Sequence, residues 1–340
     1  MLVLSVALAV YGCTLTRTSS THFPVTVTPH SDIDMYRAVA ARVHAGSPYY
    51  ATVSQELVSR DYPTSPFLNF RLPTLAYLAK WMPDPAQIGW LLRAIGVAAT
   101  AAWVLAVRRA SGELASLAAF LLLLPTLAIT MTPEGFWLHE AWAGLLLSLS
   151  LALDALQRPR SSLLAWLAAA CVRELSVLQA GVRLLVAARE RRPRVVVHWA
   201  LALALFAAIL LVHARSASGF IAPDAVRSPS WLAFGGYPFL LNLAQRSALL
   251  VSAPDWVTAL VLPTCLYGFA AGSKGATRNV GPVVLAYLAA WLFVGRRDND
   301  YWGLIIAPLL PLGLLQLPEA LRRARGASVA SLAHARSDSH

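Results

Sequence analysis

Long apolar blocks, separated by short clusters of charged residues, set the pattern of this chain. Most blocks are close to the roughly 20 residues that a transmembrane helix needs. The blocks fall at about 1–16, 66–82, 86–107, 113–131, 138–156, 161–189, 195–214, 254–271, 279–295 and 302–317. This pattern predicts an all-α, polytopic membrane protein rather than a soluble domain.

Two of these blocks differ from a full membrane span. The block 66–82 is short and contains two prolines, an arginine and a lysine, so we expect it to be re-entrant or to lie at the outer face. The block 161–189 is too short for two spans and holds Arg173-Glu174 in its middle. It is expected to form two short helices that dip into the membrane and return. The prediction is therefore about eight full spans plus two re-entrant or short-helix segments, roughly 8–11 helices in all.

Basic clusters between the blocks set the expected orientation, because cytoplasmic loops carry an excess of Lys and Arg. The clusters assigned to the cytoplasm are Arg108-Arg109, Arg158 with Arg160, Arg189 to Arg194, Lys274 with Arg278, and Arg322 to Arg325. Both termini are then cytoplasmic. Residues 1–325 are expected to form one transmembrane domain, and residues 326–340 a disordered cytoplasmic tail. The outer loops are 17–65, 132–137, 215–253 and 296–301.

Composition agrees with a membrane protein and removes one class of partner. Hydrophobic residues make up 57% of the 340 residues and charged residues only 13%, which excludes a disordered chain. A net charge of +11 would suggest nucleic acid in a soluble protein. Here it reflects cytoplasmic loops and anionic lipid, so membrane lipid and no nucleic acid is expected as a partner. The excess of Arg over Lys, with many Ala and Leu residues, indicates a bacterial cell membrane.

The first outer loop carries the sharpest signal for a functional site. Ser31 suits the N-cap of a helix, with Asp32 and Asp34 in its first turn. Met35, Val39 and Val43 recur at helical spacing, and the segment 45–48 (Ala-Gly-Ser-Pro) ends the helix. The pattern predicts a short amphipathic helix just outside the membrane, with Asp32 and Tyr36 on one face because they are four residues apart.

This loop resembles a known family. Asp32-x-x-x-Tyr36, followed by small residues and by Gly46-Ser-Pro-Tyr49 just after the first membrane helix, resembles the GT-C glycosyltransferases. The likeness is greatest to the bacterial branch that uses polyprenyl-phosphate mannose. Members of that family are polytopic and carry an essential acidic residue in the first outer loop. Asp32 matches that acid by its distance to Tyr36, and Asp34 is the reserve candidate.

Three later segments extend the resemblance over much of the chain. The stretch 62–73 resembles the Tyr-Pro and Arg-x-x-Pro segment of the same group, and Arg173-Glu174 resembles a basic–acidic pair found mid-chain there. Asp300-Tyr301, leading into 307–312, resembles the last outer loop and the helix after it. The chain is shorter than most enzymes of this family, so an incomplete catalytic apparatus stays an alternative.

The resemblance implies transfer of a sugar, mannose or a similar hexose or pentose, from a polyprenyl-phosphate donor to a glycan or glycolipid acceptor of the cell envelope. A carboxylate would deprotonate the acceptor hydroxyl, and direct displacement would invert the anomeric carbon. An arginine suits the departing phosphate because its planar fork binds two oxygens at once. Neither a P-loop nor a Rossmann fingerprint occurs, which fits a lipid-linked donor.

The candidate site residues follow from these roles. Asp32 and Asp34 are the catalytic candidates. The candidates for the donor phosphate and substrate are Tyr36, Arg71, Arg173, Glu174, Arg296 and Arg297, and those for the surrounding cavity are Glu134, His139, Glu140 and Asp300. No cofactor is expected, although a divalent cation held by Asp32, Glu134 and Glu140 stays open.

Each candidate also has a plain structural interpretation. Asp32 suits the N-terminus of a helix by charge alone, and Arg71 suits a snorkelling position at the membrane surface. Arg173-Glu174 would serve as an ion pair at a helix break. Two other functions compete with the glycosyltransferase: a transporter or flippase for a lipid-linked substrate, and a non-catalytic membrane partner of an envelope-assembly complex. A transporter should have paired broken helices in two similar halves, and only the block 161–189 is broken in this way.

Overall fold

The computed structural model describes residues 1–18, 31–247, 250–272 and 275–337. These parts of the chain contain helices and two isolated β-bridges but no strand. The helices are α1 (Leu2–Thr18), α2 (Asp32–His44), α3 (Tyr49–Ser59), α4 (Thr74–Lys80), α5 (Ile88–Ser111), α6 (Glu113–Leu123), α7 (His139–Ala155), α8 (Pro159–Val172), α9 (Val177–Arg189), α10 (Pro193–Ser218), α11 (Gly236–Gln245), α12 (Asp255–Gly272), α13 (Val280–Trp291) and α14 (Leu312–Ser337). The prediction of an all-helical protein is confirmed.

Short 3-10 helices connect or extend several of these elements. They are η1 (Phe67–Asn69), η2 (Pro85–Gln87), η3 (Leu124–Met131), η4 (Glu174–Ser176), η5 (Gly275–Thr277) and η6 (Arg297–Ile305). Two of them carry residues that the sequence singled out. The 3-10 helix η4 lies between α8 and α9, and η6 lies between α13 and α14.

Among the described residues, three helical stretches are long and apolar enough to cross a membrane: Pro85–Ser111, Glu113–Met131 and Pro193–Ser218. The segments Asp255–Ala271 and Gly275–Trp291, bent by 100° relative to each other, would together make a fourth. The chain thus has helices suited to a membrane, but the predicted eight full spans are not confirmed. Other apolar helices among the described residues are too short to cross as straight rods: α7 has 17 residues, α8 has 14 and α9 has 13.

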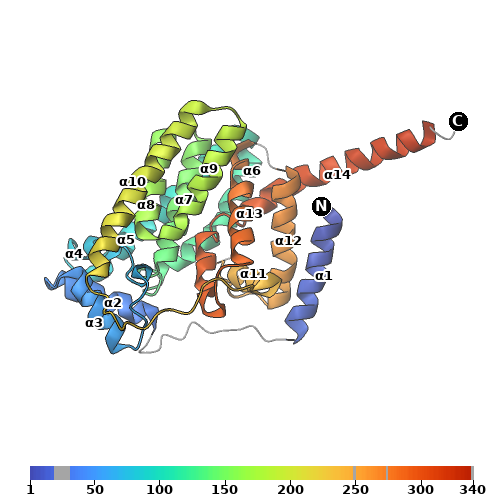
Figure 1. Cartoon of the computed structure of the whole chain (residues 1–340). Coiled ribbons are helices and arrows are strands. Elements are labelled where there is room, and N and C mark those ends of the chain that lie inside the picture. Colours follow the sequence, from blue (N-terminus) through green and yellow to red (C-terminus); the bar gives the residue numbers. More distant parts are fainter. Residues whose placement is uncertain (19–30, 248–249, 273–274, 338–340) are drawn as a thin grey trace.

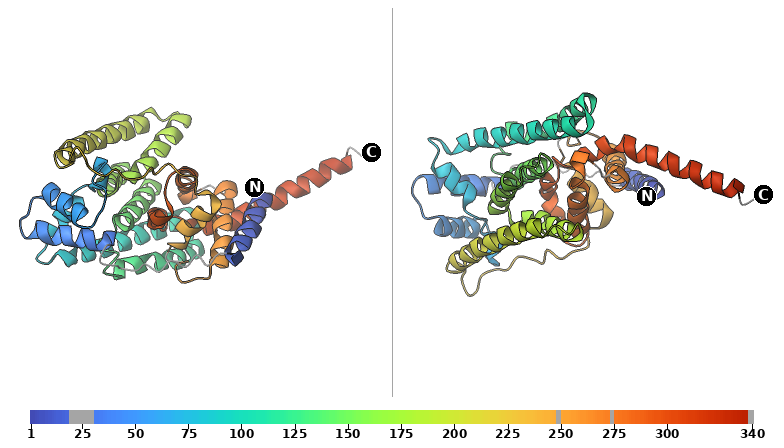
Figure 2. Two further views of the ribbon diagram at one scale, coloured as in Figure 1. Left: turned by 60° about the horizontal axis from the view of Figure 1, so that its bottom comes forward. Right: turned by 90° about the horizontal axis from the view of Figure 1, so that it is seen from above.

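The helices form layers around α7. Viewed from above, α5 and α6 lie on one side, α7 and α8 in the middle, and α9 and α10 on the other side (Figure 2). Helix α7 is buried along most of its length, including Trp142, Leu145 and Leu147, because it packs against α5 and α8 on opposite faces. By contrast α10 is largely exposed, because only 11% of its most apolar 18-residue stretch is buried inside the protein. That exposure suits contact with lipid.

The first outer loop folds into a small layer of its own at one end of the helices. Helices α2 and α3 lie together there, at the opposite end from the turn between α9 and α10 (Figure 1). Met35, Val39 and Val43 of α2 are buried against Val53 and other apolar residues of this layer, as the amphipathic pattern predicted. Each such side chain contributes roughly 1.5–3 kcal/mol when fully buried.

The two ends of helix α2 also match the sequence prediction. The Ser31 hydroxyl accepts a hydrogen bond from the Asp34 amide at 3.2 Å, which satisfies a free N–H group of the first turn. The helix ends at His44, and Gly46 follows with a φ of +102°, a conformation that favours glycine. Asp32 is therefore fixed at the start of a well-defined helix.

The block 161–189 forms two short helices, as predicted. Helix α8 ends at Val172, the 3-10 helix η4 follows, and α9 begins at Val177. Arg173, at the break, has an extended backbone, which turns the chain back toward its starting end. The turn lies beside the start of α4, since the Thr74 hydroxyl donates a hydrogen bond to the carbonyl of Cys171.

The segment 66–82 forms only short helices, whereas the C-terminal segment forms a longer helix than the sequence predicted. The segment 66–82 contains only η1 and the seven-residue α4, too short to span, while its depth in a membrane stays a prediction. Helix α14 continues to Ser337, where the sequence predicted a disordered tail from residue 326. Ala and Arg are strong helix formers, so a helix that starts on a packed N-terminal half extends through them.

A strap, residues 219–235, crosses the end of the molecule that holds the first outer loop. The Ser228 amide donates to the Ser65 carbonyl at 2.8 Å. Farther along, the Ala233 amide donates to the Phe293 carbonyl at 3.0 Å, and the Gly295 amide to the Trp231 carbonyl at 2.7 Å. The strap therefore joins the first outer loop to the segment that precedes η6.

Candidate functional site

Seven polar side chains gather where the first outer loop meets the helix ends. They are Asp32, Tyr36, Arg71, Glu140, Arg173, Glu174 and Tyr301, which we call the polar cluster. They come from α2, the segment before α4, the start of α7, the break between α8 and α9, and η6. The contact of Tyr301 with Asp32 joins residues that are 269 positions apart in the chain.

Asp32 is held by two tyrosine hydroxyls. Tyr301 donates to Asp32 Oδ2 at 3.2 Å, and Tyr62 also hydrogen-bonds the Asp32 side chain. Burial raises the pKa of Tyr301 well above its usual value, and the nearby carboxylates of Asp32 and Glu140 raise it further. Tyr301 therefore stays protonated over the physiological range and acts as a donor to Asp32.

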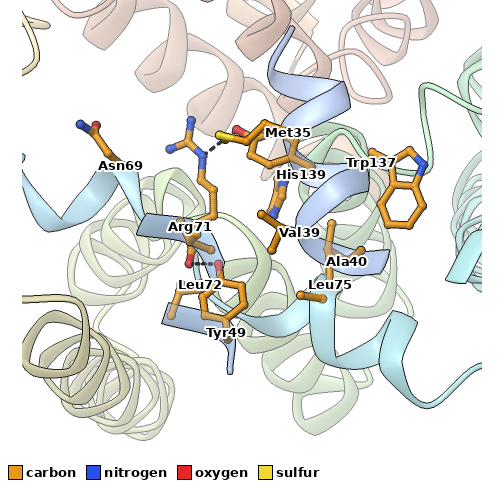
Figure 3. A pocket seen from close by; sticks show the side chains of 13 residues that line it. Met35, Val39, Ala40, Tyr49, Asn69, Arg71, Leu72, Leu75, Trp137 and His139 are labelled. Atoms are coloured by element: carbon orange, nitrogen blue, oxygen red, sulfur yellow. Dashed lines mark hydrogen bonds between the residues drawn. The ribbon is translucent and has the colours of Figure 1, made fainter. Parts of the chain in front are cut away.

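Arg71 is held along its length by aromatic residues. The Tyr49 hydroxyl donates to the Arg71 carbonyl at 2.6 Å, and Arg71 Nε donates to the Tyr36 hydroxyl at 3.1 Å. Figure 3 shows the Arg71 side chain extending away from the backbone that Tyr49 holds. His213 of α10 bonds the carbonyl of the preceding Phe70 at 2.7 Å, so the first outer loop and α10 together fix this arginine.

Arg173 is the more enclosed of the two cations in the cluster. Its residue is 1% exposed, and Nε lies 2.6 Å from Glu140 Oε1, while Nη1 contacts Glu174. Its guanidinium also lies 5.7 Å from the centre of the Trp302 ring, within reach of a cation–π contact. Arg173 is thus occupied by two carboxylates, whereas Arg71 reaches Glu174 only at 3.6 Å. Of these two cations, Arg71 is the one with capacity for an additional anion.

Two buried atoms of the cluster region lack a hydrogen-bond partner among the described residues. They are Glu140 Oε2 and Nδ1 of the neighbouring His139, whose ring lies edge-on to Tyr36 at 4.5 Å. Buried polar atoms are normally paired, so a water molecule or a ligand hydroxyl would be stabilised here. A cavity of about 20 Å³, enough for roughly one water molecule, is lined by Tyr36, Arg71 and His139.

A large apolar groove adjoins the cluster. Its volume is about 670 Å³, and its walls come mainly from α9, α10 and α13. The lining residues are Leu68, Glu174, Leu175, Val177, Leu178, Leu203, Ala204, Phe206, Ala207, Leu210, Tyr287, Ala290, Trp291, Val294 and Trp302. Glu174 is the single charged residue among these, so the groove meets the polar cluster at that side chain. This groove had no signal in the sequence, because it forms between helices that are each simply apolar.

Several predicted site residues lie apart from these contacts. Asp34 pairs with Arg37 at 3.8 Å, one turn farther along the exposed face of α2, so Asp32 fits the role of base better. Arg296 pairs with Asp298 at 2.9 Å. Asp300 pairs with Arg246 and is a contact between elements rather than a lining residue of either cavity.

The structure says less about Arg297 and Glu134, two other predicted site residues. The side chain of Arg297 lies outside the described part of the chain. Glu134 is half-buried in the turn before Trp137, whose amide donates to the Glu134 carbonyl. Among the described residues, no group of three or more His, Cys, Asp or Glu side chains is placed to hold a metal ion.

Sequence reasoning missed four residues that the structure ties to this region. Tyr301 and Tyr62 each belonged to a quoted motif but had no assigned role, whereas His213 and Arg246 belonged to no motif. Only the tyrosines, beside acidic or proline residues in outer loops, had a local signal. Comparison with protein-family models, with curated proteins and with solved structures finds no match to this chain.

Proposed function

We propose that the protein is a membrane glycosyltransferase that moves a sugar from a polyprenyl-phosphate donor to an envelope acceptor. The observation that carries this proposal is the meeting of two features at one place. A carboxylate held by tyrosines and a partly available arginine lie together, and a large apolar groove ends beside them. A lipid-linked anionic donor needs both an apolar channel and a cation, and its reaction needs a base.

In this proposal Asp32 accepts the proton of the acceptor hydroxyl as the hydroxyl oxygen attacks the anomeric carbon. The bond from that carbon to the phosphate oxygen breaks, and polyprenyl phosphate leaves with the electron pair. Direct displacement inverts the configuration at the anomeric carbon. Arg71 stabilises the departing phosphate, because its contact with a carboxylate, that of Glu174, is loose at 3.6 Å. Tyr301 and Tyr62 orient the Asp32 carboxylate.

Arg173 has a different part in this proposal. It is enclosed between Glu140 and Glu174, so it fixes the positions of both carboxylates and does not meet the donor. The resemblance of the first outer loop to the bacterial mannosyltransferases gives mannose or a similar sugar as the first donor to test. The groove alone would equally suit a flippase, but a flippase has no need of a base beside the cation.

The experiment is a transfer assay on the purified full-length chain with radiolabelled polyprenyl-phosphate mannose and a crude envelope acceptor. Asp32→Asn keeps the shape of the side chain and removes the base, so we expect transfer to fall by at least about 100-fold. Asp34→Asn is the matched control and should keep transfer within about threefold, because the Asp34 carboxylate pairs with the exposed Arg37 and, among the described residues, makes no hydrogen bond or ion pair with Tyr301 or Arg71. Equal transfer by the wild type and Asp32→Asn would contradict the proposal.

A further inference from the structure

An ion pair joins the end of α11 to η6, next to the polar cluster. Arg246 directly follows α11, and its Nε lies 2.9 Å from Asp300 Oδ2, which its Nη2 also contacts. Both side chains are largely buried, at 16% and 14% exposed. The pair joins segments that are 54 residues apart, so it is a tertiary contact rather than a local one.

The backbone of η6 is packed flush against α11 beside this pair. A Cβ atom built at Gly303 would lie 2.0 Å from the Leu243 carbonyl oxygen, so a side chain at 303 would push the two elements apart. At the start of η6, the Asn299 side chain accepts from the Arg296 amide at 3.1 Å. Helix α7 also packs closely on η6, since a Cβ atom built at Gly144 would lie 2.2 Å from the Leu304 carbonyl oxygen. The orientation of η6 is therefore set by its packing on α11 and α7 and, next to Tyr301, by the Arg246–Asp300 pair.

Tyr301, the residue after Asp300, carries this orientation to the polar cluster. Its hydroxyl donates to Asp32 Oδ2 at 3.2 Å. Tyr301 sits in a short 3-10 segment, where a small rotation of the backbone would move the hydroxyl at the far end of the ring by an ångström or more. Misplacement of a positioning group by about 1 Å can reduce a rate by as much as roughly 100-fold.

We propose that Arg246 is a positioning residue for Asp32: by binding Asp300 it fixes η6 so that the Tyr301 hydroxyl orients the Asp32 carboxylate. This inference rests on the proposed function, because it assigns Arg246 to the site where Asp32 acts as the base. Arg246 touches neither Asp32 nor the apolar groove, so its effect passes through Asp300 and Tyr301.

The same segment supplies a matched control. Asp298 lies two residues before Asp300 and also pairs with an arginine, Arg296, at 2.9 Å. Its side chain is 64% exposed, and its partner lies in the same segment, so this pair does not connect η6 to α11. Asp300→Asn and Asp298→Asn therefore make the same chemical change with and without loss of the tertiary contact.

The kinetic test compares these variants in the transfer assay with polyprenyl-phosphate mannose. Asp300→Asn and Arg246→Gln should each lower kcat by about tenfold, with KM for the donor within about twofold, and Asp298→Asn should leave both unchanged. Arg246→Lys should recover much of the lost rate. In a Tyr301→Phe background, Arg246→Gln should have no further effect, because its route to Asp32 is already gone. Equal losses for Asp298→Asn and Asp300→Asn, or additive losses in the double variant, would overturn the inference.

A second readout does not depend on transfer. With 3-fluorotyrosine at position 301, the fluorine NMR signal of the full-length protein should shift in Asp32→Asn and in Asp300→Asn but not in Asp298→Asn. If the wild type transfers no sugar and the signal still behaves in this way, the proposed function fails while the positioning of Tyr301 stands. If sugar is transferred and the fluorine signal does not shift in Asp300→Asn, the positioning inference fails while the proposed function stands.

Discussion

The two ends of α7 carry the same kind of contact with different surroundings. Near its start, Glu140 pairs with Arg173 at 2.6 Å, and near its end, Asp154 pairs with Arg183 at 2.9 Å. The two carboxylates are 14 residues apart, roughly 21 Å along the helix. Both pairs involve α7 and the block 161–189, so one packing arrangement produces two buried ion pairs.

The surroundings decide what each pair can do. Asp154 is completed by Asn279, whose Nδ2 donates at 2.7 Å, and its side chain is 20% exposed. Glu140 is fully buried, lies in a cluster built from outer loops as well as helices, and keeps one oxygen without a described partner. A carboxylate–arginine pair is thus structural where neighbouring helices complete it. It becomes part of a candidate site where loops and an apolar groove meet it.

The largest expected difference between the two ends concerns stability. Arg173→Met would leave Glu140 buried without its cation and Glu174 with only the longer contact to Arg71, which should cost about 3–5 kcal/mol of the free energy of unfolding. Arg183→Met leaves Asp154 with Asn279 and partial access to water, so the loss should be about 1–3 kcal/mol. Chemical unfolding of both variants in detergent measures this difference. Equal losses would show that the two pairs are equivalent.

The next difference concerns activity at equal folding. Asp154→Asn should lower the free energy of unfolding by about 1–3 kcal/mol, because Arg183 loses its carboxylate. Its transfer rate per folded molecule should stay within about twofold of the wild type, since Asp154 lies about 21 Å from Glu140. Transfer assays corrected for the folded fraction test this. A large loss of rate would mean that the polar pair at the far end of α7 also serves the reaction.

The apolar groove meets the polar cluster at Glu174, and filling it should give a smaller effect. Ala207→Trp would fill part of the groove and should raise KM for the polyprenyl donor by about tenfold. Leu201→Trp, on the same helix but 64% exposed and outside the groove, should leave KM unchanged. Donor titrations of the two variants decide between them. A rise in KM for both would indicate that α10 as a whole, and not the groove, affects the donor.

The smallest effect lies in the outer-loop layer that supports Asp32. Glu56 lies 2.7 Å from Arg42 and also contacts Arg60. Burial acts to raise the pKa of Glu56, but its hydrogen bonds to Arg42 and Arg60 outweigh burial and lower the pKa. A lowered pKa stabilises the fold above the ordinary carboxyl pKa of about 4.3, and this stabilisation is lost as the pH falls through the lowered value.

Glu56→Gln should therefore be less stable than the wild type by about 1 kcal/mol at pH 7, and the two should converge as the pH falls through the lowered pKa of Glu56. Thermal unfolding across this pH range measures the difference. A gap that stays constant with pH would mean that the charge of Glu56 contributes nothing.

The sequence predicted those parts of the site that local rules control. Ser31 as N-cap, the buried stripe of α2 and the break at Arg173-Glu174 depend on residues a few positions apart, and the structure confirms them. The number of membrane spans was not predictable in the same way. An apolar run reports burial, but not whether it is divided into helices of 12 to 17 residues, as at α7 and α13.

The residues that complete the site had no such local signal. No residue near Arg246 in the sequence distinguishes it from other arginines that follow a helix, and its role depends on Asp300, 54 residues later. His213 belongs to a long apolar helix and reaches the carbonyl of Phe70, 143 residues earlier. These pairings are set by how the helices stack, and one sequence does not encode that in any spacing.

The contact between Asp32 and Tyr301 also has a consequence for synthesis. Since 269 residues separate the two, the carboxylate emerges from the ribosome long before the tyrosine that orients it. Membrane insertion and folding of the earlier segments can proceed while the acid still lacks this partner. The polar cluster and the apolar groove are thus incomplete in the nascent protein, and both are completed only when the segment carrying Tyr301 and Trp302 has been made.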